Sequence, residues 1–173
     1  SDIEASVASI AKRGIDLSGN RGLACDPKPV WTRLGAIGTE LWLDTGDMGD
    51  AERLWSEEFT ALTTNNTLLS KEVGKGIYDD LIRSAVSELR AIDGTVSGET
   101  LVQEIGILLN AHHGLRLVEK FGCRVSVELH TDLAHDLAAS LCVARRLHAA
   151  CPSHFIVKVP LTPTAILLSL IHI

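Results

Sequence analysis

The sequence predicts an α/β fold built on a parallel β-sheet. Two observations support this prediction: short apolar runs of strand type alternate with long helical patterns, and the runs contain few polar residues. Strands that alternate with helices form βαβ units with parallel strands, and apolar strands indicate a sheet that is covered on both faces. At 173 residues, 46% of them hydrophobic, the chain is long enough for one domain with a sizeable core.

The first elements follow from periodicity and turn residues. Apolar side chains at helical spacing predict a helix over residues 2–16, and the Gly- and Pro-rich segment 18–29 interrupts this pattern. A short strand is expected at residues 41–44, a brief helix at 50–58, and a second strand, rich in threonine, at 59–64.

The remaining elements are longer helices and two further strands. Helical patterns cover residues 75–92 and 98–121, with an Asp-Gly break between them. Residues 124–129 form the third strand, and residues 131–150 form a third long helix that is capped by its first or second residue. The fourth strand covers residues 155–160.

Charge and composition argue against several classes of function. A formal net charge of −6 and an isoelectric point near 5.6 disfavour a surface that holds nucleic acid or anionic lipid. The sequence contains no stretch of the roughly 18 apolar residues that a membrane span requires. The 4 cysteines have neither C-x-x-C spacing nor the density of a disulfide scaffold, which predicts reduced thiols and a cytoplasmic location.

Lys158 stands within the apolar fourth strand, where a lone ammonium group is unusual. Burial without a partner disfavours the charged form of a lysine, and a neutral amine is a nucleophile that forms Schiff bases with carbonyl substrates. In the alternative interpretation, Lys158 extends from the strand end to solvent or forms a structural ion pair with an acid. Its position alone favours neither interpretation.

Each of the four predicted strands carries a polar residue at or just beyond its carboxyl end, namely Asp44, Asn65, Glu128 and Lys158. Side chains two positions apart share one face of a strand, so strands that wrap toward a barrel bring these groups together at the rim of its interior. Barrel enzymes keep their active sites at this rim. Carboxylates there can carry the protons that imine formation requires, and an amide can hold a substrate hydroxyl or carbonyl.

Three of these residues also have a structural interpretation. Asp44 begins an Asp-Thr-Gly-Asp turn, and Asn65 with Asn66 fits a turn. Glu128 is placed for a salt bridge, with Lys158 as one candidate partner. The joint occurrence of four polar groups at equivalent strand positions favours a site.

The same segments resemble the first four strand motifs of the transaldolase family, in the same order and over roughly residues 40–165. The motifs read Leu-Trp-Leu-Asp-Thr-Gly-Asp at 41–47, Leu-Thr-Thr-Asn-Asn-Thr-Leu-Leu at 62–69, Val-Ser-Val-Glu at 125–128 and Ile-Val-Lys-Val-Pro-Leu-Thr at 156–162. The resemblance implies a parallel (β/α)8 TIM-barrel fold, with about the first four β/α units present. It also implies transfer of a three-carbon dihydroxyacetone unit between sugar phosphates, as in the pentose phosphate pathway.

The resemblance gives a role to each residue that matches a motif. Lys158 falls on the Schiff-base lysine, Asp44 on the general acid/base of carbon–carbon bond cleavage, and Glu128 on the carboxylate that handles the water of imine formation. Asn65 and Thr63 fall on substrate-binding positions. The related fructose 6-phosphate aldolases generally carry glutamine at the position of Glu128, which favours the transaldolase side.

The partners implied by the resemblance are sugar phosphates: a donor of the fructose 6-phosphate class and an aldose phosphate acceptor. Self-association into a homo-oligomer is a further expected interaction. The resemblance implies neither a metal nor an organic cofactor, and neither nucleic acid nor a membrane is an expected partner.

The chain also departs from the family pattern. Asn66 and Thr67 stand where the family usually has Pro-Ser or Pro-Thr, and Ala165 stands where a glycine is usual. A complete barrel has eight strands, of which four are visible, and the serine and arginine that hold phosphate in the family lie on later strands.

Three segments are therefore expected. Residues 1–39 form an N-terminal helix and loop extension, and residues 40–164 form the first half of a barrel. Residues 165–173 are apolar without a polar face, which predicts a truncated or non-native tail.

Other functions fit parts of the same sequence. One is aldolase-type cleavage of fructose 6-phosphate, and another is a non-catalytic half barrel that binds sugar phosphates or oligomerises. A metal-dependent hydrolase is disfavoured, because two histidines five positions apart do not share a helix face. Its candidate ligands are His130, Asp132, His135 and Asp136.

Overall fold

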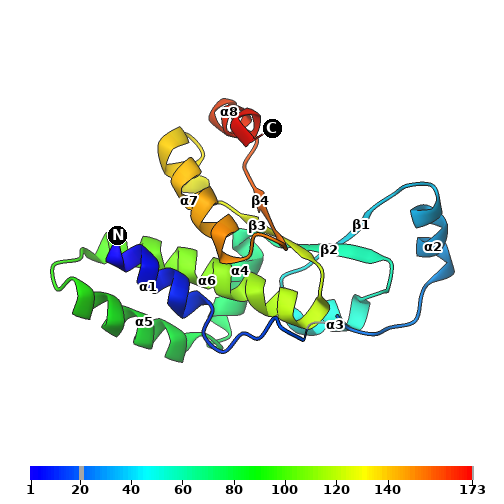
Figure 1. Cartoon of the computed structure of the whole chain (residues 1–173), viewed down its shortest axis with the longest axis horizontal. Coiled ribbons are helices and arrows are strands. Elements are labelled where there is room, and N and C mark those ends of the chain that lie inside the picture. Colours follow the sequence, from blue (N-terminus) through cyan, green and yellow to red (C-terminus); the bar gives the residue numbers. More distant parts are fainter. Residues whose placement is uncertain (20–21, 173) are drawn as a thin grey trace.

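The computed structural model describes residues 1–19 and 22–172, and it contains an open sheet of four parallel strands (Figure 1). The strands lie side by side in chain order: β1 (Leu41–Asp44), β2 (Phe59–Thr63), β3 (Arg124–Glu128) and β4 (Phe155–Lys158). The predicted α/β fold with a parallel sheet and the first four β/α units of a barrel is confirmed, and the sheet is not closed.

Helices precede the sheet, connect its strands and follow it. In the described part of the chain they are α1 (Asp2–Ala11), α2 (Pro29–Ala36), α3 (Met48–Leu54), α4 (Asn66–Gly74), α5 (Asp79–Ile92), α6 (Gly98–Phe121), the 3₁₀ helix η1 (Thr131–Leu133), α7 (Leu137–Ala150) and α8 (Pro163–His172). The connection from β1 to β2 contains α3, and that from β3 to β4 contains α7. Parallel strands need such crossovers, because a tight turn can join only antiparallel neighbours.

The core lies between the sheet and the helices that cover one of its faces. Leu62, Val125 and Val127 point to this face and are fully buried. The helix α6 packs against β3 and against α1, and it is buried along most of its length. On the other face of the sheet Trp42 is 39% exposed, whereas Ala61 and Ser126 are buried. The polar residues at the strand ends, Asp44, Glu128 and Lys158, lie on the opposite face.

Gly114 lets α6 approach the sheet closely. A Cβ atom at this position would lie 2.8 Å from Cζ of Phe155 and 3.0 Å from Cγ1 of Val127. We expect Gly114→Ala to lower the free energy of unfolding by about 1–3 kcal/mol, because overpacking outweighs the higher helix propensity of alanine. Urea unfolding measures this decrease.

Gly106 in the same helix provides the control, because an added Cβ there meets no atom within 4 Å. Gly106→Ala is expected to be stabilising by up to about 1 kcal/mol. If both substitutions change the free energy of unfolding by the same amount, the contacts of an added Cβ at Gly114 do not destabilise the fold.

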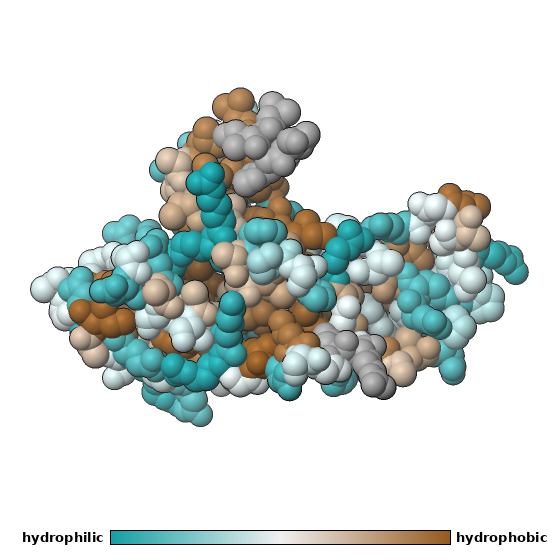
Figure 2. All heavy atoms as spheres, in the orientation of Figure 1, coloured by the Kyte–Doolittle hydropathy of each residue, from teal (hydrophilic) through white to brown (hydrophobic). Residues whose placement is uncertain are grey.

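Apolar side chains are exposed on the helices that precede and follow the sheet in the chain. Figure 2 shows apolar surface on α2, which precedes the edge strand β1, and on α8, which follows the edge strand β4. Val30 and Ile37 are 57% and 78% exposed, and Ile166 and Leu167 are 50% and 53% exposed. Open strand edges with apolar neighbours are surfaces that further protein would cover.

The segment that follows β4 is ordered as a helix. Thr162 accepts a hydrogen bond from the backbone N–H of Ala165 through its hydroxyl oxygen, and its hydroxyl donates to the carbonyl of Ala134. Ala165 and Leu168 are buried, and α8 packs against α7. The first part of the apolar segment 165–173 thus contributes to the core.

Two predicted helices have different boundaries in the structure. The predicted helix at residues 2–16 ends at Ala11, and Gly14 just beyond it has a positive φ of 74°. The helix predicted for residues 75–92 begins at Asp79, because Gly76 turns the chain with a φ of 75°. Glycine adopts this backbone conformation without strain.

The helix predicted for residues 131–150 is interrupted. Its first residues form the separate 3₁₀ helix η1, and α7 begins only at Leu137. The carboxylate of Asp136 caps α7 by accepting from the N–H of Ala139 at 2.9 Å. The predicted cap at residue 131 or 132 is therefore wrong. The brief helix predicted for residues 50–58 is α3, which starts and ends earlier, and the sequence patterns do not predict the helices α2 and α4.

Candidate active site

Lys158 and Glu128 meet at the carboxyl ends of β4 and β3. The two residues are register partners, and Nζ of Lys158 lies 3.5 Å from Oε1 of Glu128. The same Nζ donates a hydrogen bond to the carbonyl oxygen of Thr64 at 2.8 Å. The lysine side chain is 34% exposed and the glutamate side chain is 22% exposed. The amine is therefore partly shielded from water, paired with one carboxylate, and still accessible.

A pocket of about 580 Å³ contains this pair. Its walls come from the carboxyl ends of three strands and from the segments that follow them: Asn65, Asn66, Thr67, Leu68, Glu128, Thr131 and Lys158. Small-molecule sites usually have volumes of roughly 300–1,000 Å³, and barrel enzymes place them at this end of the sheet. The pocket has the size and the position of a substrate site.

Asn66 fixes the carboxylate of Glu128. Its backbone N–H and its side-chain Nδ2 both donate to Oε2 of Glu128, at 3.2 and 3.3 Å. Nδ2 also donates to the carbonyl of Leu129 at 3.0 Å. These bonds hold Oε2, so that Oε1 is the oxygen that faces the lysine. The sequence prediction missed this contact, for which the Asn-Asn pair after the second strand was the available signal.

Asn65 begins α4 as its N-cap. Its Oδ1 accepts a hydrogen bond from the N–H of Leu68 at 2.9 Å, which satisfies one of the free donors of the first helical turn. The side chain nevertheless belongs to the wall of the pocket. The turn predicted for Asn65 and Asn66 is instead the start of a helix, and the capping residue Asn65 lies in the same pocket wall as Glu128 and Lys158.

Asp44 and Thr63 lie on the same face of the sheet as Lys158, but at the level of the residue two positions before it, further from the carboxyl end of the sheet. Asp44 pairs with Thr63 in the register, Thr63 with Ser126, and Ser126 with Ile156, which precedes Lys158 by two positions. Asp44 is exposed, and neither it nor Thr63 lines the pocket. Neighbouring strands are about 4.8 Å apart, so in the open sheet β2 and β3 separate Asp44 on β1 from Lys158 on β4. In a closed barrel the two side chains would face each other across the interior.

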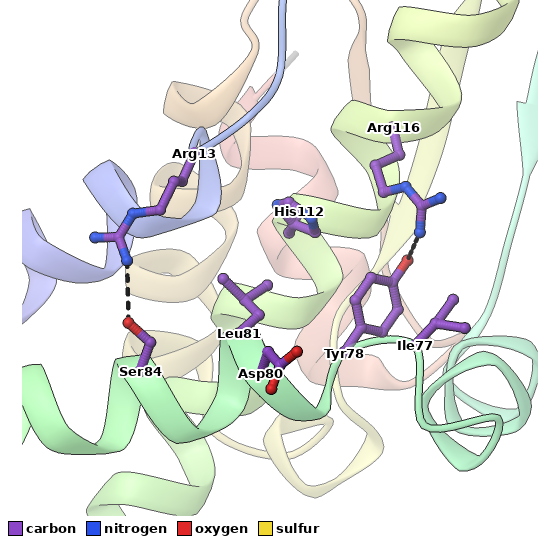
Figure 3. A pocket seen from close by; sticks show the side chains of 8 residues that line it. All are labelled: Arg13, Ile77, Tyr78, Asp80, Leu81, Ser84, His112 and Arg116. Carbon is purple, nitrogen blue, oxygen red and sulfur yellow. Dashed lines mark hydrogen bonds between the residues drawn. The ribbon is translucent and has the colours of Figure 1, made fainter.

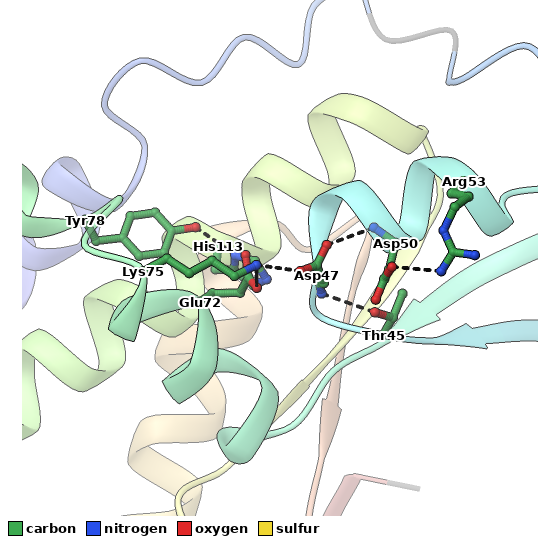
Figure 4. Close-up of polar contacts among 8 residues, drawn as sticks. All are labelled: Thr45, Asp47, Asp50, Arg53, Glu72, Lys75, Tyr78 and His113. Carbon is green, nitrogen blue, oxygen red and sulfur yellow. Dashed lines mark hydrogen bonds and ion pairs between the residues drawn. The ribbon is translucent and has the colours of Figure 1, made fainter.

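Polar contacts hold the turn that follows Asp44 (Figure 4). Asp47 caps α3 through the N–H of Asp50, and its other carboxylate oxygen lies 2.5 Å from Nζ of Lys75. Lys75 lowers the pKa of Asp47 to about 2, and Asp47 with Glu72 raises the pKa of Lys75. The carboxyl end of the turn is thereby anchored to α3 and to Lys75, the C-cap of α4.

Gly46 packs this turn against α4. A Cβ atom at Gly46 would lie 2.9 Å from both Cβ of Leu68 and Oγ1 of Thr64. Leu68 lines the pocket and Thr64 binds Lys158, so the turn that carries Asp44 touches residues of the lysine site.

A buried histidine lies behind the same turn. Nδ1 of His113 and the hydroxyl oxygen of Tyr78 are 2.7 Å apart. Burial disfavours the charged ring and lowers the pKa of His113 to about 4. The backbone of Gly46 opposes part of this shift, although Nε2 has no partner of hydrogen-bond geometry among the described residues. His113 is thus neutral near pH 7.

The residues considered as metal ligands do not assemble into a site. In the described ranges 1–19 and 22–172, no group of three or more His, Cys, Asp or Glu side chains is arranged to hold a metal ion. His130 pairs with Asp132 at 3.3 Å on the exposed segment after β3. Nor does any helix in these ranges have the length and apolar character to cross a membrane.

Comparison with known proteins identifies a family that matches most of the chain. Residues 41–169 match the family model described as transaldolase/fructose-6-phosphate aldolase. A transaldolase of Xanthomonas campestris pv. campestris (strain B100) is 36% identical over 106 residues, which cover 61% of this chain and 32% of that protein. A transaldolase of Rhizobium etli (strain CIAT 652) is 32% identical over 112 residues, which cover 65% of this chain and 33% of that protein.

The match begins at the first residue of β1 and includes all four strands and the first turns of α8. The chain spans about a third of the length of the curated relatives it matches. The family model nevertheless matches about three quarters of this chain, and the matched residues include Lys158 and Glu128. The chain belongs to the transaldolase/fructose-6-phosphate aldolase family.

Proposed function

We propose that this chain supplies the Schiff-base part of a transaldolase-type site, which transfers a dihydroxyacetone unit between sugar phosphates. The observation that carries the proposal is the position of the Lys158 amine, 3.5 Å from Glu128 in a pocket at the carboxyl ends of the strands. The family supports the class of reaction. The pentose phosphate pathway and the cytoplasm are the setting that we propose for it.

The first chemical step uses Lys158 and Glu128. The neutral amine attacks the keto carbon of a donor such as fructose 6-phosphate, and proton transfer from nitrogen to oxygen gives a carbinolamine. Loss of water then requires a proton on the departing hydroxyl group. Glu128 is close enough to Nζ to take the proton that the ammonium group loses and to deliver it to this hydroxyl group, either directly or through one water molecule, and the product is an iminium ion on Lys158.

The second step is assigned to Asp44. A carboxylate that removes the proton from the donor's C4 hydroxyl lets the C3–C4 bond break, because the iminium nitrogen accepts the electron pair. An aldose phosphate leaves, and a three-carbon enamine stays on the lysine. The enamine then attacks the aldehyde carbon of an acceptor, to which Asp44 returns the proton. Asp44 lies on the correct face of the sheet for this role, and it reaches the substrate when the sheet curves into a barrel.

The amide and hydroxyl groups have binding roles in this proposal. Asn65 on the pocket wall and Thr63 on the interior face contact the hydroxyl groups of the donor. Asn66 orients Glu128, as its two hydrogen bonds to Oε2 indicate.

Aldolase-type cleavage of fructose 6-phosphate is the second candidate, because the matching family includes both activities. The two reactions share the iminium and enamine intermediates, and they differ in whether an aldehyde acceptor or a proton takes the enamine. A carboxylate at position 128 favours transfer. The alternative of a non-catalytic half barrel is supported by the open sheet and its exposed edges.

Reductive trapping tests the proposal. The complete natural protein is incubated with fructose 6-phosphate and sodium borohydride, which reduces an imine to a stable secondary amine. We expect a covalent three-carbon adduct that peptide mass spectrometry assigns to Lys158. If no adduct forms, or if the adduct lies on another lysine, the Schiff-base assignment is wrong. Loss of activity on treatment with a chelator would instead support metal catalysis.

A further inference from the structure

A second pocket lies on the helical side of the molecule and has no residue in common with the lysine site. It has a volume of about 520 Å³ and lies between the end of α1, the start of α5 and the middle of α6 (Figure 3). Its walls are formed by Arg13, Ile77, Tyr78, Asp80, Leu81, Ser84, His112 and Arg116. We propose that this pocket binds a small phosphate monoester, with Arg116 as the group that holds the phosphate. This inference does not depend on the proposed enzymatic function.

Arg116 is a partly buried cation without an acidic partner. Its Nη1 donates to the hydroxyl oxygen of Tyr78 at 3.1 Å, and its guanidinium lies 5.6 Å from the centre of the Tyr78 ring. Within residues 1–19 and 22–172, no carboxylate forms an ion pair with it. Tyr78 does not supply the missing charge, since burial raises the pKa of its hydroxyl group. A guanidinium that has lost part of its hydration gains most from an oxyanion that accepts two parallel N–H bonds.

The other charged groups of the wall are already paired. Arg13 donates to both carboxylate oxygens of Glu88 at 2.9 Å, so its charge is balanced. Asp80 pairs with Arg83 at 2.6 Å, and its side chain is 99% exposed. The unbalanced charge of the pocket is therefore positive and centred on Arg116.

His112 adds a second polar group on the same helix, one turn from Arg116. Its Nδ1 lies 2.9 Å from the carbonyl oxygen of Ala11, which can only accept, so Nδ1 carries the proton and Nε2 is not engaged by this bond. Burial is the main cause that lowers the pKa of His112, and the charge of Arg116 lowers it further. In the neutral ring Nε2 is an acceptor that gives no hydrogen bond to an anion, so Arg116 remains the group that holds the phosphate.

The apolar residues of the pocket wall indicate the chemistry of the part of the ligand beyond the phosphate. Ile77 and Leu81 present apolar surface beside the basic groups, and Ile77 is 50% exposed. A ligand of the required shape has a phosphate at Arg116 and an apolar or aromatic body that covers these two side chains. The volume is sufficient for a molecule of about ten to fifteen non-hydrogen atoms.

Isothermal titration of the chain with phenyl phosphate, inorganic phosphate and neutral phenol tests this inference. We expect saturable binding of one phenyl phosphate per chain, weaker binding of inorganic phosphate, and no saturable binding of phenol. Arg116→Met should weaken phenyl phosphate binding about 10- to 100-fold, the usual effect of removing charge-assisted hydrogen bonds to an anion. Arg116→Lys should give an intermediate affinity, because lysine keeps the positive charge but lacks the two parallel N–H groups of the guanidinium.

Arg90→Met is the matched control, because Arg90 is exposed on α5 and does not line the pocket. This variant should bind as the unmodified chain does. Circular dichroism and urea unfolding of each variant show whether the fold is intact. Equal affinities for the unmodified chain and both Arg116 variants would overturn the proposal, as would an absence of saturable phenyl phosphate binding to the unmodified chain.

Discussion

Replacing Lys158 with methionine is expected to lower turnover of fructose 6-phosphate by the complete protein about 1,000-fold or more, and to eliminate the borohydride adduct. A reaction that proceeds through a covalent intermediate has no pathway once the nucleophile is removed. Methionine keeps the length and apolar character of the lysine stem. The substitution removes only the hydrogen bond to Thr64 and the ion pair with Glu128, so the fold should survive. Coupled measurement of aldose phosphate release gives the rate.

Lys71→Met is the matched control for this substitution. Lys71 is exposed on α4, in the helix that Asn65 begins, and it does not line the pocket. Its replacement should leave both turnover and adduct formation unchanged. If Lys158→Met keeps more than a tenth of the activity while the Lys71 variant behaves normally, the amine of Lys158 is not the nucleophile and another group must be sought.

Replacing Asp44 with asparagine is expected to lower turnover about 100- to 10,000-fold while the borohydride adduct on Lys158 persists. Asparagine has nearly the shape of aspartate and cannot remove a proton, so imine formation proceeds and bond cleavage does not. The trapped adduct should therefore change from the three-carbon dihydroxyacetone unit to the whole six-carbon donor. Intact-protein mass spectrometry distinguishes the two adducts directly.

The Asp44 prediction tests whether the sheet closes. Asp44 is separated from Lys158 by two intervening strands, and it reaches the pocket only if the strands curve around a common interior. Asp26→Asn, a change of an exposed aspartate before α2, should have no effect. Loss of the adduct in Asp44→Asn would show that Asp44 acts before the imine forms. Unchanged turnover would remove Asp44 from the mechanism.

Local sequence signals predicted two elements with their correct boundaries. The strand at Leu41–Asp44 and the helix at Gly98–Phe121 agree with the prediction at both ends. The helix begins after Ser97, whose hydroxyl oxygen accepts from the N–H of Thr100, and ends at Gly122 with a positive φ of 64°. Such caps depend on residues within one turn of the helix end, so the sequence contains the information.

Elements that depend on distant contacts were missed or misplaced. The helix α4 starts at Asn66 and carries few apolar residues, and its position is fixed by contacts with the turn after β1 and with Glu128. The segment after His130 forms a short 3₁₀ helix before α7 begins, and Thr162 beyond β4 donates to the carbonyl of Ala134 there. Hydrophobic periodicity does not report such contacts.

The sequence by itself determined which polar side chains share the inner face of the sheet, because alternation along a strand is a local property of extended backbone. It thereby identified Lys158, Glu128 and Asp44 as groups at the carboxyl ends of neighbouring strands. Only the tertiary structure decided which of them touch. The register between β3 and β4 places Glu128 level with Lys158. The register across all four strands places Asp44 level with Ile156, two residues before Lys158. Register and curvature depend on how helices far apart in the chain pack against the sheet, and no single strand encodes that packing.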